Sequence, residues 1–270
     1  MKDCLLVYLS ISLPTQTRTD KKVSAQVEED NHTARGRARV VKRLFSSETF
    51  GPVQAAAQQV RMAHYKHSLA FDSTGARVLP ATAVIDYENA VGAAIANFKS
   101  VADEFNAVYQ DVLVTEMQRL GDLFNPSDYP SNPAAACTAR IYYRTVGEVV
   151  TVDEHAREAI AENVRQSIEE GMATAMDDAL ARLASVVERM VHKLDDSDAI
   201  FRNSLLANVQ EQAVILQTLN IFDDPRLNES ISKIRLLGVT TPDQVRSDPG
   251  IRRTVADSGR SILESLKGVL

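Results

Sequence analysis

The sequence predicts an α+β protein that is mostly α-helical, with a long antiparallel, coiled-coil-like helical hairpin and a small β-sheet or β-hairpin element. Apolar residues recur in steps of three and four over residues 82–124 and 153–194, which is the heptad spacing of helices in a left-handed supercoil. Alternating apolar residues over 5–13 indicate a β-strand. The turn sequence Asp-Ser-Thr-Gly between two apolar runs indicates a hairpin over 69–79. Because no series of short strands is present, we do not expect an OB-fold.

The N-terminal elements follow from local patterns. Two serines interrupt the apolar residues of the first segment and a proline ends it, which favours a strand over an exported signal segment. Charged residues over 20–30 indicate a short helix, and residues 32–39 are expected to form a basic loop. A helix over 50–68 has Pro52 near its first turn, where the missing backbone N–H costs nothing.

The later elements are mostly helical. The first long helix, over residues 82–124, must end at the segment that follows it, which holds three prolines in nine residues. β-Branched and aromatic residues over 139–152 predict a strand before the second long helix. Further helices follow, over residues 199–220, 225–237 and 239–270. Three consecutive parts result: a basic N-terminal part with the strand and hairpin (1–80), a long-helix core (81–238) and a short helical C-terminal tail (239–270).

Charge is distributed unevenly along the chain, whose net charge is −6. Residues 1–80 hold 12 Lys and Arg against 7 Asp and Glu, whereas residues 81–270 hold 18 against 29. Two interpretations of the basic segment remain open: it pairs with acidic helices of the same or another subunit, or it binds a polyanion such as a nucleic acid. Interleaved aromatic residues favour the second interpretation, because unpaired bases stack on aromatic faces beside Arg and Lys. These aromatic residues are Phe45, Phe50, Tyr65 and Phe71.

The candidate DNA-binding residues are the cations of this segment together with a histidine and a tyrosine. They are Lys21, Lys22, Arg35, Arg37, Arg39, Lys42, Arg43, Arg61, His64, Tyr65, Lys66 and Arg77. Tyr65 is the best stacking candidate, because its neighbours in the sequence are polar. A second, weaker candidate is the strand segment over 140–144, which also alternates cations and aromatic rings.

Several classes of protein are disfavoured. The sequence contains no phosphate-binding glycine loop, nucleophile elbow or zinc-protease motif, so we expect no enzymatic activity, no cofactor and no catalytic or metal-binding residues. Two cysteines are too few for a disulfide scaffold and favour an intracellular location. No run of about 18 apolar residues is present, so we expect no association with a membrane.

Several short motifs resemble those of a family of phage and prophage proteins, and they are spread over nearly the whole chain. They are Leu9-Ser10-Ile11-Ser12, Asp20-Lys21-Lys22, Arg61-x2-His64, Ser68-Leu69-x-Phe71-x3-Gly75-x-Arg77-x-Leu79-Pro80, Tyr87, Met176-Asp177-Asp178-Ala179-Leu180-x-Arg182-Leu183, Phe201-Arg202-Asn203-Ser204-Leu205 and Leu219-Asn220-x3-Asp224-Pro225. Within that family the chain is most similar to the single-stranded-DNA-binding RNA polymerase cofactors of N4-related phages.

The resemblance implies a non-enzymatic, sequence-tolerant single-stranded DNA-binding protein of the host cytoplasm. Such a protein would act as a phage transcription cofactor that holds melted promoter DNA and recruits the phage RNA polymerase. The alternative is an oligomeric scaffold or adaptor for an AAA ATPase system, without nucleic acid. In either case we expect a homo-oligomer, because the first long helix carries two apolar stripes, more than one partner helix can cover.

Overall fold

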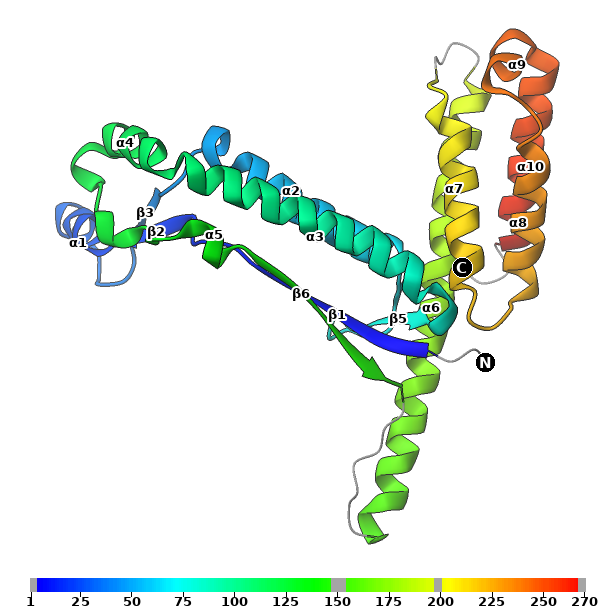
Figure 1. The fold of residues 1–270 in the computed structure, drawn as a ribbon, viewed down its shortest axis with the longest axis horizontal. Helices are drawn as coiled ribbons and strands as arrows, with labels where there is room; N and C mark the ends of the chain where they lie inside the picture. The colour runs from blue at the N-terminus through cyan, green and yellow to red at the C-terminus, as the bar shows by residue number, and fades with distance from the viewer. Residues whose placement is uncertain (1–3, 147–153, 197–200, 267–270) are drawn as a thin grey trace. The chain divides into compact units, whose positions relative to one another are not determined.

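A computed structural model of the chain describes the backbone of residues 4–146, 154–196 and 201–266 (Figure 1). The described part is mostly helical and contains a small antiparallel sheet. This confirms the α+β, mostly α class that the sequence predicts. Among the described residues, no helix combines the length and the apolar character that a membrane span requires.

The chain folds into two compact units, each assembled from separate segments. Unit 1 consists of Met1–Tyr8, Tyr65–Glu88 and Tyr142–Leu270, and unit 2 consists of Leu9–His64 and Asn89–Ile141. These units differ from the three consecutive parts expected from composition. Residues distant in the sequence pair and pack within each unit, so a boundary drawn from composition along the chain does not separate them.

The sheet has four strands in the order β4-β5-β1-β6. Its first strand, β1 (Cys4–Ser12), runs antiparallel to β5 (Arg77–Pro80), with Cys4 opposite Pro80 and Val7 opposite Arg77. β6 (Thr138–Thr145) is the other neighbour of β1. The strands expected over 5–13 and 139–152 are therefore present; the part of the second one over 147–152 lies outside the described residues.

The predicted hairpin is also present and joins β4 (Leu69–Ala70) to β5. The Asp72 carboxylate accepts hydrogen bonds from the backbone N–H groups of Thr74 (2.8 Å) and Ala76 (3.1 Å). Gly75 has φ +93°, a conformation that glycine adopts without steric cost. The turn sequence thus supplies both the side-chain acceptor and the left-handed residue that the hairpin requires.

The core of unit 2 is a cluster of aromatic rings. Phe45 stacks on Phe50 with ring centroids 5.2 Å apart, and Phe105 meets both rings edge-on. Tyr109 and Tyr129 contact Phe45 and donate hydrogen bonds to backbone carbonyls through their hydroxyl groups. These rings come from the segment before α2 (Ser47–Lys66), from α2, from α3 (Val84–Ala107), from α4 (Tyr109–Leu120) and from the loop after it.

The first long helix is not continuous, contrary to the heptad prediction over 82–124. Val108, between α3 and α4, has φ −101° and ψ 9°, which interrupts the helix without a proline or glycine. The interruption lies next to Tyr109, whose ring enters the aromatic core and whose hydroxyl donates to the Pro130 carbonyl at 2.8 Å. Tertiary packing therefore overrides the regular spacing of apolar residues.

The second long helix is present as α6 (Glu154–Asp195). Within unit 1 it packs against α7 (Ser204–Leu219) and α10 (Pro249–Leu266), and α10 also contacts α8 (Pro225–Leu237) and α9 (Pro242–Ser247). The predicted pairing of the two long helices in one hairpin is not confirmed. The expectation of a short tail over 239–270 is wrong for α10, which buries one face of apolar residues in the core of unit 1.

One glycine of α6 gives the β4–β5 hairpin access to the helix. A Cβ atom added at Gly171 would lie 2.4 Å from two ring carbons of Phe71, the buried residue that follows β4. Carbon atoms cannot approach so closely. Gly171 therefore allows the Phe71 ring to pack closely against α6. The helix continues through this position.

The same substitution should have opposite effects at two helical glycines. We expect Gly171→Ala to lower the free energy of unfolding by about 1–3 kcal/mol, because the methyl group overpacks the site against a rigid ring. Gly92→Ala in α3 meets no atom within 4 Å and should raise the free energy of unfolding by about 0.5–1 kcal/mol. Urea unfolding followed by circular dichroism measures both; a stabilised Gly171→Ala variant would contradict the close packing.

Candidate nucleic-acid interface

The basic loop of unit 2 follows α1 (Lys21–Asp30) and leads into a two-stranded ribbon of β2 (Thr17–Asp20) and β3 (Val40–Arg43). Asp20 caps α1 by accepting a hydrogen bond from the Val23 N–H at 3.0 Å. Two polar side chains of α1 then hold the returning chain. The Ser24 hydroxyl accepts from the Val40 N–H at 2.9 Å, and the buried Glu28 carboxylate accepts from the Ala38 N–H at 3.1 Å. The basic loop between α1 and β3 therefore has a defined path.

Six cations lie exposed on and beside this loop, and together they form what we call the basic surface. Its members are Lys21, Lys22, Arg35, Arg37, Arg39 and Arg43. None of them makes an ion pair with a described residue. Because Asp20 pairs with Val40, Lys21 and Arg39 flank the same end of the ribbon. Two exposed carboxylates, those of Glu29 and Asp30, lie nearby in the sequence. Six cations against these two carboxylates leave the surface with an excess of positive charge.

Lys42, a predicted DNA-binding residue, is buried instead. Its ammonium group lies 2.7 Å from the Asp128 carboxylate and 3.7 Å from that of Asp20, and it donates to the Leu123 carbonyl at 2.8 Å. Side chains alternate between the two faces of a strand. The side chain of Lys42 therefore lies on one face of β3, and those of its neighbours Val41 and Arg43 lie on the other. Lys42 therefore stabilises the fold of unit 2 and is not available to a phosphate. The hydrogen bond from Val23, together with Lys42, lowers the pKa of Asp20.

Three of the four aromatic residues that favoured base stacking belong to the core. Phe45, Phe50 and Phe71 are buried. Only Tyr65 is exposed, by 50 %, and the Arg77 guanidinium lies 4.9 Å from the centre of its ring. The spacing of aromatic and basic residues in the sequence could not distinguish core rings from exposed rings, because both occur between cations on elements that are half-buried.

The remaining predicted residues are divided between the two units. Arg61 is half-buried and His64 is buried on α2 in unit 2. In unit 1, the ammonium group of Lys66 lies 2.6 Å from the Glu211 carboxylate. Arg77 is 8 % exposed. His64, Lys66 and Arg77 are thus engaged or enclosed within the protein, unlike the basic surface.

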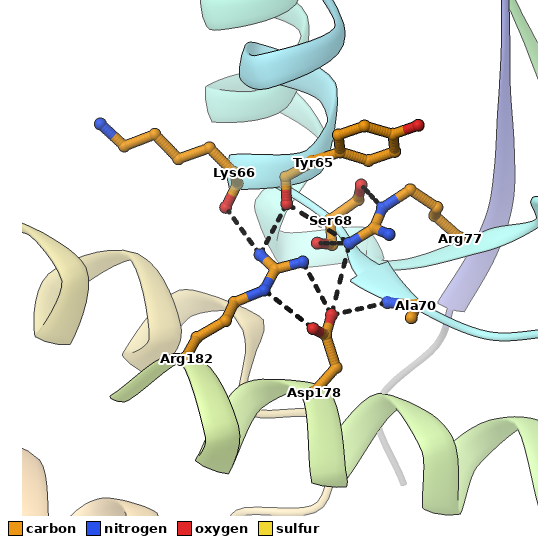
Figure 2. Close-up of polar contacts among 7 residues, drawn as sticks. All are labelled: Tyr65, Lys66, Ser68, Ala70, Arg77, Asp178 and Arg182. Atoms are coloured by element: carbon orange, nitrogen blue, oxygen red, sulfur yellow. Dashed lines mark hydrogen bonds and ion pairs between the residues drawn. The ribbon is translucent and has the colours of Figure 1, made fainter. Parts of the chain in front are cut away.

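Arg77 belongs to a polar cluster that joins three elements of unit 1 (Figure 2). Its guanidinium donates to the Ser68 hydroxyl at 2.8 Å and to the Ser68 carbonyl at 2.6 Å, and lies 3.4 Å from the Asp178 carboxylate. Burial lowers the pKa of Arg77, the positive charge of Arg182 lowers it further, and Asp178 opposes both effects. An arginine remains charged even so, so the cluster must neutralise it.

Asp178 and Arg182 complete the cluster from one face of α6. Arg182 binds the Asp178 carboxylate through two hydrogen bonds, of 2.7 and 3.0 Å, and donates to the Tyr65 carbonyl at 2.6 Å. The same carboxylate accepts from the Ala70 N–H at 2.8 Å. Tyr65 is the penultimate residue of α2, where carbonyl groups lack helical partners and carry partial negative charge. The guanidinium groups of Arg77 and Arg182 thus donate hydrogen bonds to a carbonyl group at the end of α2. The Asp178 carboxylate accepts one from the backbone of the β4–β5 hairpin.

Sequence reasoning missed the residues that position these features. Ser24 and Glu28 order the basic loop, but nothing in their spacing distinguishes them from other polar helix residues. Ser68, Arg77, Asp178 and Arg182 lie in motifs that carry the family resemblance. The structure brings these four residues together in one network of hydrogen bonds and ion pairs.

Comparison of the chain with protein families, with curated proteins and with solved structures gives no significant match. Within the described part of the chain, no three His, Cys, Asp or Glu side chains are grouped closely enough to hold a metal ion.

Adjacent aspartates provide a matched test of the cluster. We expect Asp178→Asn to lower the free energy of unfolding by about 2–3 kcal/mol, because it removes the counter-charge of two partly buried guanidinium groups. Asp177→Asn changes the exposed neighbour and should stay within about 0.5 kcal/mol. Urea unfolding compares the two variants, and equal effects would show that the Asp178 ion pairs add nothing.

Proposed function

We propose that the chain is a non-enzymatic protein that binds single-stranded DNA with little sequence preference, through the basic surface of unit 2. The observation that carries this proposal is the group of six exposed cations that make no ion pair with a described residue, in a chain whose net charge is −6. Arg and Lys side chains neutralise phosphates and release counterions, which gives affinity without reading the bases.

The order of the loop supports the same proposal. Ser24 and Glu28 hold the returning chain by hydrogen bonds to Val40 and Ala38, so Arg35, Arg37 and Arg39 project from a backbone whose path is already set. Binding then requires less loss of conformational freedom than a disordered basic segment would. The backbone is fixed while the arginine side chains stay free, which suits contact with phosphates at variable positions.

The cellular role in the proposal comes from the family resemblance. We propose that the protein acts in the host cell as a phage transcription cofactor that holds melted promoter DNA and recruits the phage RNA polymerase. A homo-oligomer is part of the same proposal. Its support is the exposed apolar side chains Val108, Val114 and Met117 of unit 2, which are 47–51 % exposed.

Those apolar side chains also support the second candidate function, an oligomeric scaffold or adaptor for an AAA ATPase system. In that case the basic surface would pair with acidic residues of another subunit. The two functions differ in what the basic surface contacts, and charge substitutions on it distinguish them.

A single strand should bind more tightly than the duplex of the same sequence. Unpaired bases expose faces that stack on aromatic rings such as Tyr65, and one stacked base accounts for at least about fivefold in affinity. Gel shift or fluorescence anisotropy with matched oligonucleotides at one salt concentration measures the ratio. Equal affinity for the two forms would reject the single-strand preference, and no binding at low salt would reject the function.

Removing three cations of the loop should change the salt dependence of binding. The triple variant Arg35→Ala, Arg37→Ala, Arg39→Ala should lower the slope of log affinity against log salt by roughly 2, at about 0.7 per phosphate contact on single strands. The control Lys99→Ala, Arg189→Ala, Arg253→Ala changes net charge equally at exposed positions elsewhere and should leave the slope nearly unchanged. If the loop variant instead loses its oligomeric state and binds DNA as before, the scaffold function is favoured.

A further inference from the structure

An exposed face of the sheet in unit 1 alternates aromatic and cationic side chains. Tyr142 and Arg144 lie two residues apart on β6 and therefore point to the same side of the strand. Tyr142 is 50 % exposed and Arg144 is exposed. The Arg144 guanidinium lies 5.3 Å from the centre of the Tyr8 ring, on the neighbouring strand β1. Tyr8, Tyr142 and Arg144 thus form one patch, which we call the β6 platform.

Contacts on the other side of the strand hold the platform in place. Tyr143 points away from it, meets the ring of Tyr87 edge-on with centroids 6.4 Å apart, and donates a hydrogen bond from its hydroxyl to the Glu88 carboxylate. Burial and the neighbouring Glu88 raise the pKa of Tyr143, so this hydroxyl remains a donor at neutral pH. The strand is fixed through Tyr143, while the side chains of the platform stay open.

The composition of the platform selects among ligands. Arg144 makes no ion pair with a described residue, so its charge is available to a phosphate. A guanidinium that lies over one aromatic ring still has a second face, on which a planar base can stack. Flat aromatic rings displayed on a sheet beside arginine are the means by which sheet-based proteins bind unpaired bases.

We infer that the β6 platform is a stacking site for the unpaired bases of single-stranded DNA, separate from the phosphate-binding residues of the basic surface. This inference rests on the proposed function and adds the base contacts that the buried Phe45, Phe50 and Phe71 do not supply. Tyr142 stacks a base with its open ring, and Arg144 contacts the adjoining phosphate or stacks a base against Tyr8. Successive side chains on one face of a β-strand are about 6.6 Å apart. This spacing suits single-stranded DNA whose neighbouring bases are unstacked from one another.

The chain contains no tryptophan, so one substitution provides a specific reporter. Tyr142→Trp places an indole on the platform, and titration with oligothymidylate should quench its fluorescence as bases stack on it. Phe222→Trp is the matched control, because Phe222 is 42 % exposed in unit 1 but lies outside the platform; its indole should not be quenched. Quenching by a duplex to the same extent, or by self-association without DNA, would overturn the inference.

Affinity measurements separate stacking from charge. Tyr142→Ala should weaken binding of oligothymidylate roughly 5- to 150-fold with an unchanged salt slope, and Tyr142→Phe should restore the affinity because it keeps the ring. Arg144→Ala should also reduce the salt slope by about 0.7. If the wild-type protein binds the oligonucleotide and the Tyr142→Trp indole is not quenched, the platform is wrong and the proposed function stands. If the wild-type protein does not bind it at low salt, both fail.

Discussion

Arg77 can be buried in unit 1 because acceptors surround its guanidinium on several sides. A charged group loses far more solvation on burial than one hydrogen bond returns, so the Ser68 oxygens, the Asp178 carboxylate and the Tyr65 carbonyl must all be in place. Arg77 also lies in β5 opposite Val7 of β1, which connects the cluster to the pairing of these two strands. From Asp178 on α6, one connected set of contacts thus reaches the hairpin, the end of α2 and the first strand.

The chain uses its cations in two ways, and burial decides which. Lys42 and Arg77 are enclosed and paired with carboxylates, so each stabilises the fold and neither can meet an external phosphate. The cations of the basic surface keep their solvation and have no carboxylate partner among the described residues. Exposed cations cost the fold little, which leaves their charge for a ligand. Two residues adjacent in the sequence, Lys42 and Arg43, lie on opposite sides of this division.

Local patterns predicted the local elements. The alternation over 5–13, the Asp-Ser-Thr-Gly turn and the charged helix over 20–30 all correspond to observed elements, because short-range spacing determines which face of an element is apolar. The break at Val108 and the packing of α6 against α10 depend on contacts between distant residues. Periodicity shows that a helix has an apolar stripe but does not name the partner that covers it.

The same limit applies to the candidate interface. The basic loop could be predicted from composition, since five cations occur within nine residues of the sequence. Which of these cations are exposed could not be predicted from the sequence, because Lys42 forms an ion pair with Asp128, 86 positions later in the chain. Arg77 and Asp178 are 101 positions apart. The exposed ring of Tyr142 and the buried rings of Phe45 and Phe50 differ in the elements that cover them, which no spacing along the chain encodes.

The division of the chain between the units sets an order for folding during synthesis. All segments of unit 2 precede Tyr142, whereas unit 1 needs both the first strand and the helices that follow residue 142. At roughly 5–20 residues per second, the ribosome takes on the order of 10–50 s to make the whole chain. Unit 2 can therefore become compact while the β4–β5 hairpin still lacks α6, the helix that packs against β4. During that interval the face of the hairpin that α6 will cover is exposed, and co-translational chaperone contact would be most useful there.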